Sequence, residues 1–145
     1  MLEFIAARGS ASFLQTPAWA RVKSEWRGER VGFYDGDELT GVGLILYRKL
    51  PKLPRYLAYL PEGPVLDWSR DDIAEHFDAL VTHVKKRQAF AVRIGPAVVH
   101  RIWGTKTIKT AIADDNITSL TEVEPDIVTP EGEHVVSVLK IGRAS

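Results

Sequence analysis

Lys23 lies between two tryptophans in the segment FLQTPAWARVKSEW at 13–26. If this segment is helical, a rotation of about 100° per residue places Trp26 at about 340° and Lys23 at about 40° from Trp19 around the axis. The ammonium would then lie at the margin of an apolar stripe and could hold an anion at the lip of a cleft. Alternatively, its methylene groups simply cover a tryptophan. Lys23 and Trp19 are therefore candidate ligand-binding residues.

A second candidate site is the stretch YLPEGPVLDW at 59–68. Each of its two prolines removes a backbone donor and fixes φ, which excludes a helix interior or the middle of a sheet. A rigid turn would preorganise its flanks, so that Tyr59 offers a ring and a hydroxyl and Asp67 offers an acceptor to one cleft. A structural crossover with an outward tyrosine explains the same pattern.

Other catalytic patterns are missing from the sequence. It contains neither a phosphate-binding Gly-Lys-Ser/Thr loop nor a Gly-x-Ser-x-Gly nucleophile elbow. His76 and His83 are seven residues apart on roughly one face of a predicted helix, so they either share a site or are two surface imidazoles. No histidine pair has i, i+4 metal spacing, so we expect no metal. The four histidines are His76, His83, His100 and His134.

The composition predicts one ordinary domain spanning residues 1–145. Lys plus Arg equals Asp plus Glu at 19 each, so net charge favours neither a nucleic-acid binder nor a membrane-surface binder. Cysteine is absent, and we expect a cytoplasmic protein without a secretory leader. The apolar runs are much shorter than the roughly 20 residues of a transmembrane helix.

The elements that position the first candidates are a helix and three strands. A helix is predicted from Pro17 to Trp26, with Thr16 as its N-cap, Trp19, Val22 and Trp26 as its apolar stripe, and Gly28 at its end. Residues 30–50 read as a hairpin around the turn signal Asp35-Gly36, and 55–60 read as a third strand.

The rest of the chain alternates helices with one strand. Ser69 is expected to cap a helix over 69–88, whose apolar face is Ile73, Phe77, Leu80, Val81 and Val84. A buried strand is predicted at 89–95, a weaker helix at 98–113, an acidic connector up to Pro130 and a helix at 131–140. This order is neither a regular parallel alternation nor an all-β meander, so the class is α+β.

Three ordered pieces resemble a known family. FLQTPAWARVKSEW at 13–26, KLP at 49–51 and YLPEGPVLDW at 59–68 together resemble the FemABX family, and IADDNITSL at 112–120 adds to the likeness. The resemblance runs from about Phe13 to Ile112 and implies one lobe of a normally two-lobed protein with an N-acetyltransferase-like (GNAT-like) mixed sheet flanked by helices. The Arg/Gln-x-x-Gly-x-Gly/Ala loop of coenzyme A-dependent acetyltransferases is missing from the sequence.

The resemblance also implies a reaction and its partners. FemABX proteins, known as methicillin-resistance factors and interpeptide-bridge enzymes of bacteria, transfer an amino acid from aminoacyl-tRNA to the stem peptide of a peptidoglycan precursor, UDP- or lipid-linked. In the family a lysine at the position of Lys23 contacts the precursor's diphosphate, and many members have arginine where this chain has Glu62. No cofactor is implied, and Asp67 is the one candidate base.

Alternatives to a complete enzyme stay open. Family members are much longer and bind tRNA through a second lobe absent here, so this chain is expected either to take part in catalysis or to be a non-catalytic or truncated binding lobe. A homodimer that replaces the second lobe is a further option, because exposed core surface favours pairing. A regulatory module that shares only the fold is the third interpretation.

Overall fold

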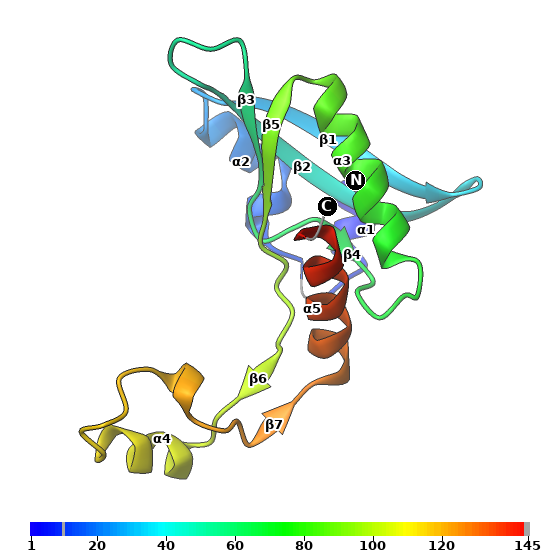
Figure 1. Cartoon of the computed structure of the whole chain (residues 1–145). Coiled ribbons are helices and arrows are strands. Elements are labelled where there is room, and N and C mark those ends of the chain that lie inside the picture. The colour runs from blue at the N-terminus through cyan, green and yellow to red at the C-terminus, as the bar shows by residue number, and fades with distance from the viewer. Residues whose placement is uncertain (10, 144–145) are drawn as a thin grey trace. The chain divides into compact units, whose positions relative to one another are not determined.

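The chain folds into two compact units, Met1–Ala97 and Val98–Ser145. The structure, a computed structural model, describes residues 1–9 and 11–143, the last four through their helical backbone alone. The first unit is a mixed sheet flanked by helices, as expected (Figure 1). Its helical elements are α1 (Leu2–Ala6), η1 (Phe13–Gln15, a 3-10 helix), α2 (Pro17–Val22) and α3 (Ile73–Lys86). Its strands are β1 (Arg27–Asp35), β2 (Glu38–Lys49), β3 (Tyr56–Leu60), β4 (Val65–Leu66) and β5 (Ala89–Ile94).

The predicted hairpin forms the long antiparallel pair of the sheet. β1 pairs with β2 along its whole length, and the turn follows Asp35 as its sequence signal indicates. Gly36 has a φ of 58°, a left-handed conformation that glycine adopts without steric cost. The strand predicted at 55–60 is confirmed as β3, which runs antiparallel to β2.

β5 is parallel to β3 and lies at one edge of the described sheet, in the order β1-β2-β3-β5. The strand predicted at 89–95 therefore exists, but the prediction that it is buried is wrong. Phe90 is 53% exposed and Arg93 is also exposed, because an edge strand has a neighbour on one side only. Apolar composition alone does not distinguish an edge strand from a central one.

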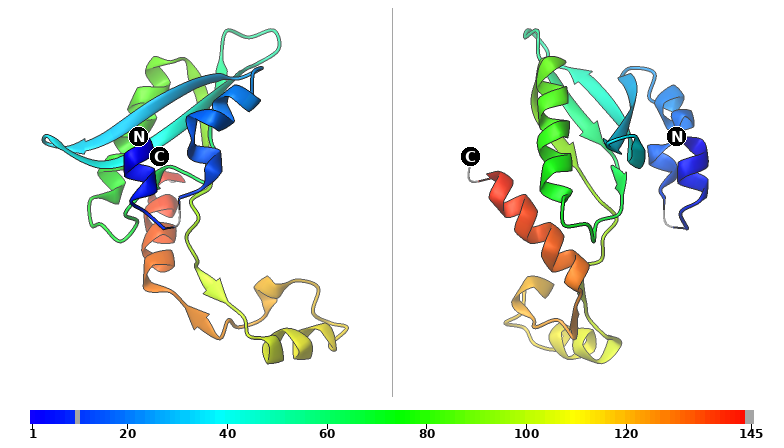
Figure 2. Two further views of the ribbon diagram at one scale, coloured as in Figure 1. Left: turned by 180° about the vertical axis from the view of Figure 1, so that it is seen from behind. Right: turned by 90° about the vertical axis from the view of Figure 1, so that its right-hand side faces the viewer.

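α3 covers one face of the sheet, while α1 and α2 lie on the other, as the right-hand view of Figure 2 shows. Ile73, Leu80 and Val84 are buried, which confirms the core of the predicted apolar face. The helix begins at Ile73 and not near Ser69, whose predicted capping role is wrong. The Ser69 hydroxyl donates instead to Asp67 at 2.6 Å and holds the chain in a turn.

α2 is shorter than the sequence predicts. Pro17 is its first residue, as expected, but Thr16 does not cap with its side chain, because its hydroxyl donates to the carbonyl of Phe13 at 2.7 Å. The helix ends at Val22, which is 63% exposed, and Trp26 lies outside it. The predicted stripe of Trp19, Val22 and Trp26 is therefore wrong.

Gly28 does not end the helix, which corrects a further prediction. It lies in β1, where a Cβ would come within 2.9 Å of the Cβ of Ala20 in α2. The glycine therefore allows α2 to pack closely on the sheet.

In the second unit, the helix predicted at 98–113 is shorter than expected. A short β6 pairs with β7, and the helix begins only after Gly104, because the amide of Gly104 and the hydroxyl of Thr107 donate to the Asp126 carboxylate. These hydrogen bonds lower the pKa of Asp126. The helix at 131–140 is confirmed. The elements are β6 (Arg101–Ile102), α4 (Thr105–Ile112), η2 (Leu120–Glu122), β7 (Ile127–Val128) and α5 (Pro130–Arg143).

Candidate functional site

Gln15 joins the two sequence segments that contain the candidate residues. Its side chain is completely buried, and its Nε2 donates to the carbonyl of Pro61 at 2.7 Å and to that of Leu44 at 3.5 Å. Its Oε1 accepts from the Leu44 amide at 2.9 Å. Leu44 lies in the stretch of β2 between the residues that pair with β3 and those that pair with β4. The side-chain amide thus supplies the hydrogen bonds that a neighbouring strand would make there.

The glycine of the turn is required by this arrangement. A Cβ at Gly63 would lie 2.2 Å from Cδ of Gln15, so any larger residue displaces the amide. The Gly63 carbonyl also accepts from the Gly95 amide at 3.4 Å, which connects the turn to the end of β5. Proline and glycine therefore interrupt two buried strands because a glutamine side chain occupies the interruption.

One line of paired residues crosses the whole sheet. The successive cross-strand partners are Gly28 on β1, Leu46 on β2, Tyr59 on β3 and Arg93 on β5. Cross-strand partners point to the same face, and α2 packs on that face at Gly28. Tyr59 and Arg93 therefore lie on the α2 face of the sheet, opposite α3.

Two arginines flank two aromatic rings on this face, and we call Arg48, Trp26, Tyr59 and Arg93 the ring–arginine row. The Trp26 and Tyr59 rings lie 6.2 Å apart. The Arg48 guanidinium lies 5.6 Å from the Trp26 ring, and that of Arg93 lies 5.6 Å from the Tyr59 ring. Both arginines are exposed and both rings are half-buried. Such stacked guanidinium groups keep their donors free for a planar or anionic ligand.

Lys23 lies next to the ring–arginine row. Its Nζ is 5.1 Å from the Trp19 ring, and its carbonyl accepts from the Trp26 amide at 2.9 Å. Among the residues that the structure describes, Lys23, Arg48 and Arg93 make no ion pair with a carboxylate. The two residues predicted from the sequence, Lys23 and Trp19, therefore contact each other, with the ammonium over the indole ring.

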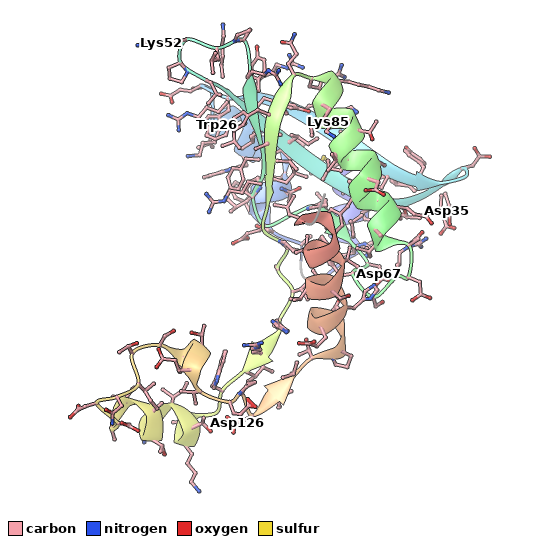
Figure 3. All side chains as sticks on the ribbon, viewed as in Figure 1. Trp26, Asp35, Lys52, Asp67, Lys85 and Asp126 are labelled. Atoms are coloured by element: carbon pink, nitrogen blue, oxygen red, sulfur yellow. The ribbon has the colours of Figure 1, made fainter. Side chains whose placement is uncertain are left out.

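Asp67 lies elsewhere in the first unit. Figure 3 shows Asp67 and Trp26 well apart, and the Trp26 ring lies 6.2 Å from the Tyr59 ring, so the turn does not direct Tyr59 and Asp67 into one compact site. The Asp67 carboxylate accepts from the hydroxyl and the amide of Ser69, at 2.6 and 3.1 Å. These hydrogen bonds lower the pKa of Asp67, which makes it a weaker base.

The α3 face carries a different polar cluster, centred on Glu29. Its carboxylate accepts from Arg87 at 2.7 Å and from the Tyr47 hydroxyl at 2.7 Å, and it lies 3.1 Å from His83. Partial burial raises the pKa of Glu29, but the hydrogen bonds from Arg87, Tyr47 and His83 outweigh that effect and lower it to about 2. Burial and the bond to Glu29 raise the pKa of Tyr47. Glu29, Arg87, Tyr47 and His83 therefore meet one another's hydrogen-bonding and charge requirements within the cluster.

His76 and His83 line the same cavity beside α3, but they do not form a ligand set. His76 is buried and stacks on Phe33, with Nε2 3.0 Å from the Thr40 hydroxyl and Nδ1 2.9 Å from the Asp72 carbonyl. His83 is paired with Glu29. Across the described residues no group of three or more His, Cys, Asp or Glu is arranged to hold a metal ion.

Three residues of this region were missed by sequence reasoning. Gln15 lies between Leu14 and Thr16 in the FLQTP segment, and nothing in that local pattern indicates that a glutamine there is buried. Arg48 and Arg93 lie in segments predicted as strands, where two-residue alternation could have placed each on a face. Their position beside Trp26 and Tyr59 depends on strand order, which the sequence does not state.

No helix among the described residues has the length and apolar character needed to cross a membrane.

Comparison with known proteins identifies relatives of this chain. A family model described as the FemAB family matches residues 2–123. Two proteins named lipid II:glycine glycyltransferase, from Staphylococcus saprophyticus and Staphylococcus haemolyticus, are 34% and 35% identical over 98 residues, covering 66% of this chain and 24% and 23% of their own lengths. A crystal structure of FemX is 30% identical, with a TM-score of 0.56, over 77% of this chain and 28% of that one. The chain spans about a quarter of the length of the curated relatives it matches.

Proposed function

Because the chain belongs to the FemAB family, we propose that it supplies the precursor-binding part of an aminoacyltransferase of peptidoglycan synthesis. The acceptor we propose is a UDP- or lipid-linked muramyl peptide, in line with the lipid II named for the relatives. In the proposed reaction a stem-peptide amine attacks the ester of an aminoacyl-tRNA, an amide forms, and the tRNA hydroxyl leaves. The donor would bind to a second lobe outside this chain.

The observation that supports this proposal most directly is the pair of exposed arginines beside Trp26 and Tyr59, next to Lys23. A precursor of this kind carries a diphosphate, sugar rings and a peptide. Guanidinium and ammonium groups match the diphosphate, and the ring faces match the sugar. A cation that already has a carboxylate partner would have to give it up to bind phosphate. The cations of this face are not engaged in that way among the described residues.

We propose a role for each residue predicted from the sequence. Lys23 binds the diphosphate, Trp19 holds the lysine stem, and the Tyr59 hydroxyl, for which no described side chain or backbone group is a partner, bonds the sugar or peptide. Asp67 is proposed to contact the far end of an extended precursor, because it lies away from Trp26.

Binding without turnover is the second candidate function. The observation that favours it is the lowered pKa of Asp67, the single candidate base, which already accepts two hydrogen bonds from Ser69. A base that takes the proton of an attacking amine works best with a pKa near the working pH. On this view catalysis needs groups from outside this chain, from a second lobe or from the partner in a homodimer.

Isothermal titration with UDP-linked muramyl pentapeptide tests precursor binding. We expect the wild-type chain to bind, Lys23→Ala to bind at least about tenfold more weakly because a charged hydrogen bond is lost, and Lys86→Ala on α3 to bind like wild type. Absence of heat from the wild-type chain, or equal affinity of the two variants, would contradict the proposal.

A transfer assay separates the two candidate functions. The chain is mixed with the precursor and with tRNA charged with radiolabelled glycine, and label in the peptide is counted. Transfer that depends on Lys23 supports catalysis by this chain, whereas binding with no transfer supports the binding-only function.

We also propose that the first unit represents the first part of an N-acetyltransferase-like lobe. The supporting pattern is an antiparallel run of β1, β2 and β3, then α3, then β5 parallel to β3. An experimental structure of a longer protein that contains this chain would test the assignment.

A further inference from the structure

A cavity of about 580 Å³ lies between β1 and α3, outside the ring–arginine row. One wall is the stretch of β1 from Val31 to Asp35, and the other is the α3 side, including Ala79, Leu80 and His83. β1 is an edge strand of the described sheet, because β2 is its one partner. The cavity therefore runs beside a strand whose outer edge is open.

The backbone of β1 presents unpaired hydrogen-bonding groups at this edge. Gly43 and Val31 face each other across the pair, while both backbone groups of Leu44 point away from β1 to Gln15. Alternation along an antiparallel ladder then directs the amides and carbonyls of Arg30 and Gly32 outward. No described hydrogen bond engages them. Gly32 lines the cavity, so its outward groups lie at the cavity wall.

The cavity wall is acidic. Its carboxylates are those of Asp35, Asp72 and Glu75, and it contains no lysine or arginine. Arg70 bonds Asp72 at 2.6 Å and approaches Asp35 at 3.4 Å, so its charge offsets only part of the charge of the three carboxylates. The α3 wall also has an apolar stretch at Ala79 and Leu80. This combination matches a segment that is basic, extended and carries small apolar side chains.

We propose that this groove binds an extended basic peptide segment, which adds to the outer edge of β1 as a further strand. Main-chain bonds to Arg30 and Gly32 supply affinity, and basic side chains facing Glu75 and its neighbours supply selectivity. A second copy of this chain fits less well, because it would bring its own acidic wall against this one. The proposal is independent of the function proposed for the opposite face of the sheet.

The test uses a labelled peptide of alternating valine and lysine, about seven residues long, with fluorescence anisotropy and amide chemical shifts as readouts. We expect saturable binding with shift changes at Arg30 and Gly32. Methylating the peptide's backbone nitrogens on its pairing edge removes strand hydrogen bonds and should weaken binding about tenfold. Replacing the lysines with glutamates should abolish binding.

Two protein variants complete the experiment. Glu75→Lys should weaken binding about threefold or more, as loss of a surface charge pair predicts, while Asp78→Lys, an exposed residue of α3 outside the cavity wall, should not. The proposal is overturned if the basic peptide does not bind, if the methylated peptide binds equally well, or if Asp78→Lys weakens binding as much as Glu75→Lys. Self-association through β1, detected by sedimentation and removed by Gly32→Pro, also overturns it.

Discussion

The two faces of the sheet use charge in opposite ways. On the α3 face, Glu29 is surrounded by Arg87, Tyr47 and His83, and the cluster is internally satisfied. On the α2 face, Arg48 and Arg93 lie over aromatic rings with no described carboxylate partner. A satisfied cluster stabilises the fold but offers little to a ligand, whereas cations held by ring faces remain available. Arginines of one sheet can therefore serve stability or recognition, according to whether a carboxylate or an aromatic ring faces them.

Gln15→Ala is the strongest test, because Gln15 fixes the turn on which both faces depend. The variant leaves the Leu44 amide and the Pro61 carbonyl without a partner and opens a cavity, so we expect unfolding to cost about 3 kcal/mol less. Urea denaturation measures the change. Gln15→Glu keeps the acceptor for the Leu44 amide but turns a buried carboxylate oxygen toward the Pro61 carbonyl, so near neutral pH it should destabilise the fold at least as much as Gln15→Ala. A loss below about 0.5 kcal/mol in Gln15→Ala would contradict the conclusion that Gln15 holds the turn against β2.

Glu29→Gln breaks the satisfied face. Near neutral pH we expect a loss of about 2 kcal/mol, because three donors lose a charged acceptor. The pKa of Glu29 in the folded protein is about 2 against an ordinary 4.5, so its contribution is complete above about pH 4.5 and disappears as the pH falls through about 2. Urea midpoints measured across that range should depend less on pH in the variant. Glu38→Gln, at an exposed residue of the same hairpin, should behave as wild type.

Glu62→Gly tests whether the backbone conformation of the turn, independently of the two faces of the sheet, limits the stability of the fold. Glu62 has a φ of 49°, which costs a residue with a side chain about 1 kcal/mol relative to glycine. We expect the variant to be more stable by about that amount, as a raised thermal midpoint. A lowered midpoint would mean that the Glu62 side chain makes a stabilising contribution of its own.

The double variant Arg48→Gln and Arg93→Gln should have the smallest effect on folding. Exposed cations without carboxylate partners contribute little, and each ring contact is worth about 0.5 kcal/mol, so the free energy of unfolding should change by no more than about 1 kcal/mol. Binding of inorganic pyrophosphate, measured by titration calorimetry, should nevertheless weaken. If stability falls as it does in Glu29→Gln, the contrast between the two faces is wrong.

Local pattern was sufficient for much of the fold. The turn at Asp35-Gly36, the apolar face of α3 and the proline that starts α2 depend on neighbours in sequence, and each was predicted from it. The likeness to the FemABX family was also evident from short ordered segments and is confirmed by the family model. The candidate lysine and its indole partner were close enough in sequence to be predicted together.

The boundaries and the composition of the site depended on tertiary contacts. α2 ends early because Trp26 turns away to meet Tyr59, a residue from another strand. Likewise, Asp67 shares a motif with Tyr59 but lies well apart from Trp26 (Figure 3), the ring neighbour of Tyr59, because β4 continues along β2 after the turn.

The sequence by itself determined the β1–β2 hairpin, β3, α3, β5 and α5, because periodicity and turn residues act over a few positions, whereas it gave no sign of α1, β4, β6 or β7. Only the tertiary structure decided that Gln15 lies between β3 and β4 and that Arg48 and Arg93 stack on Trp26 and Tyr59. The reason is physical. A buried amide needs partners from strands far away in the chain, and strand order, which sets those partners, is decided by packing of the whole sheet.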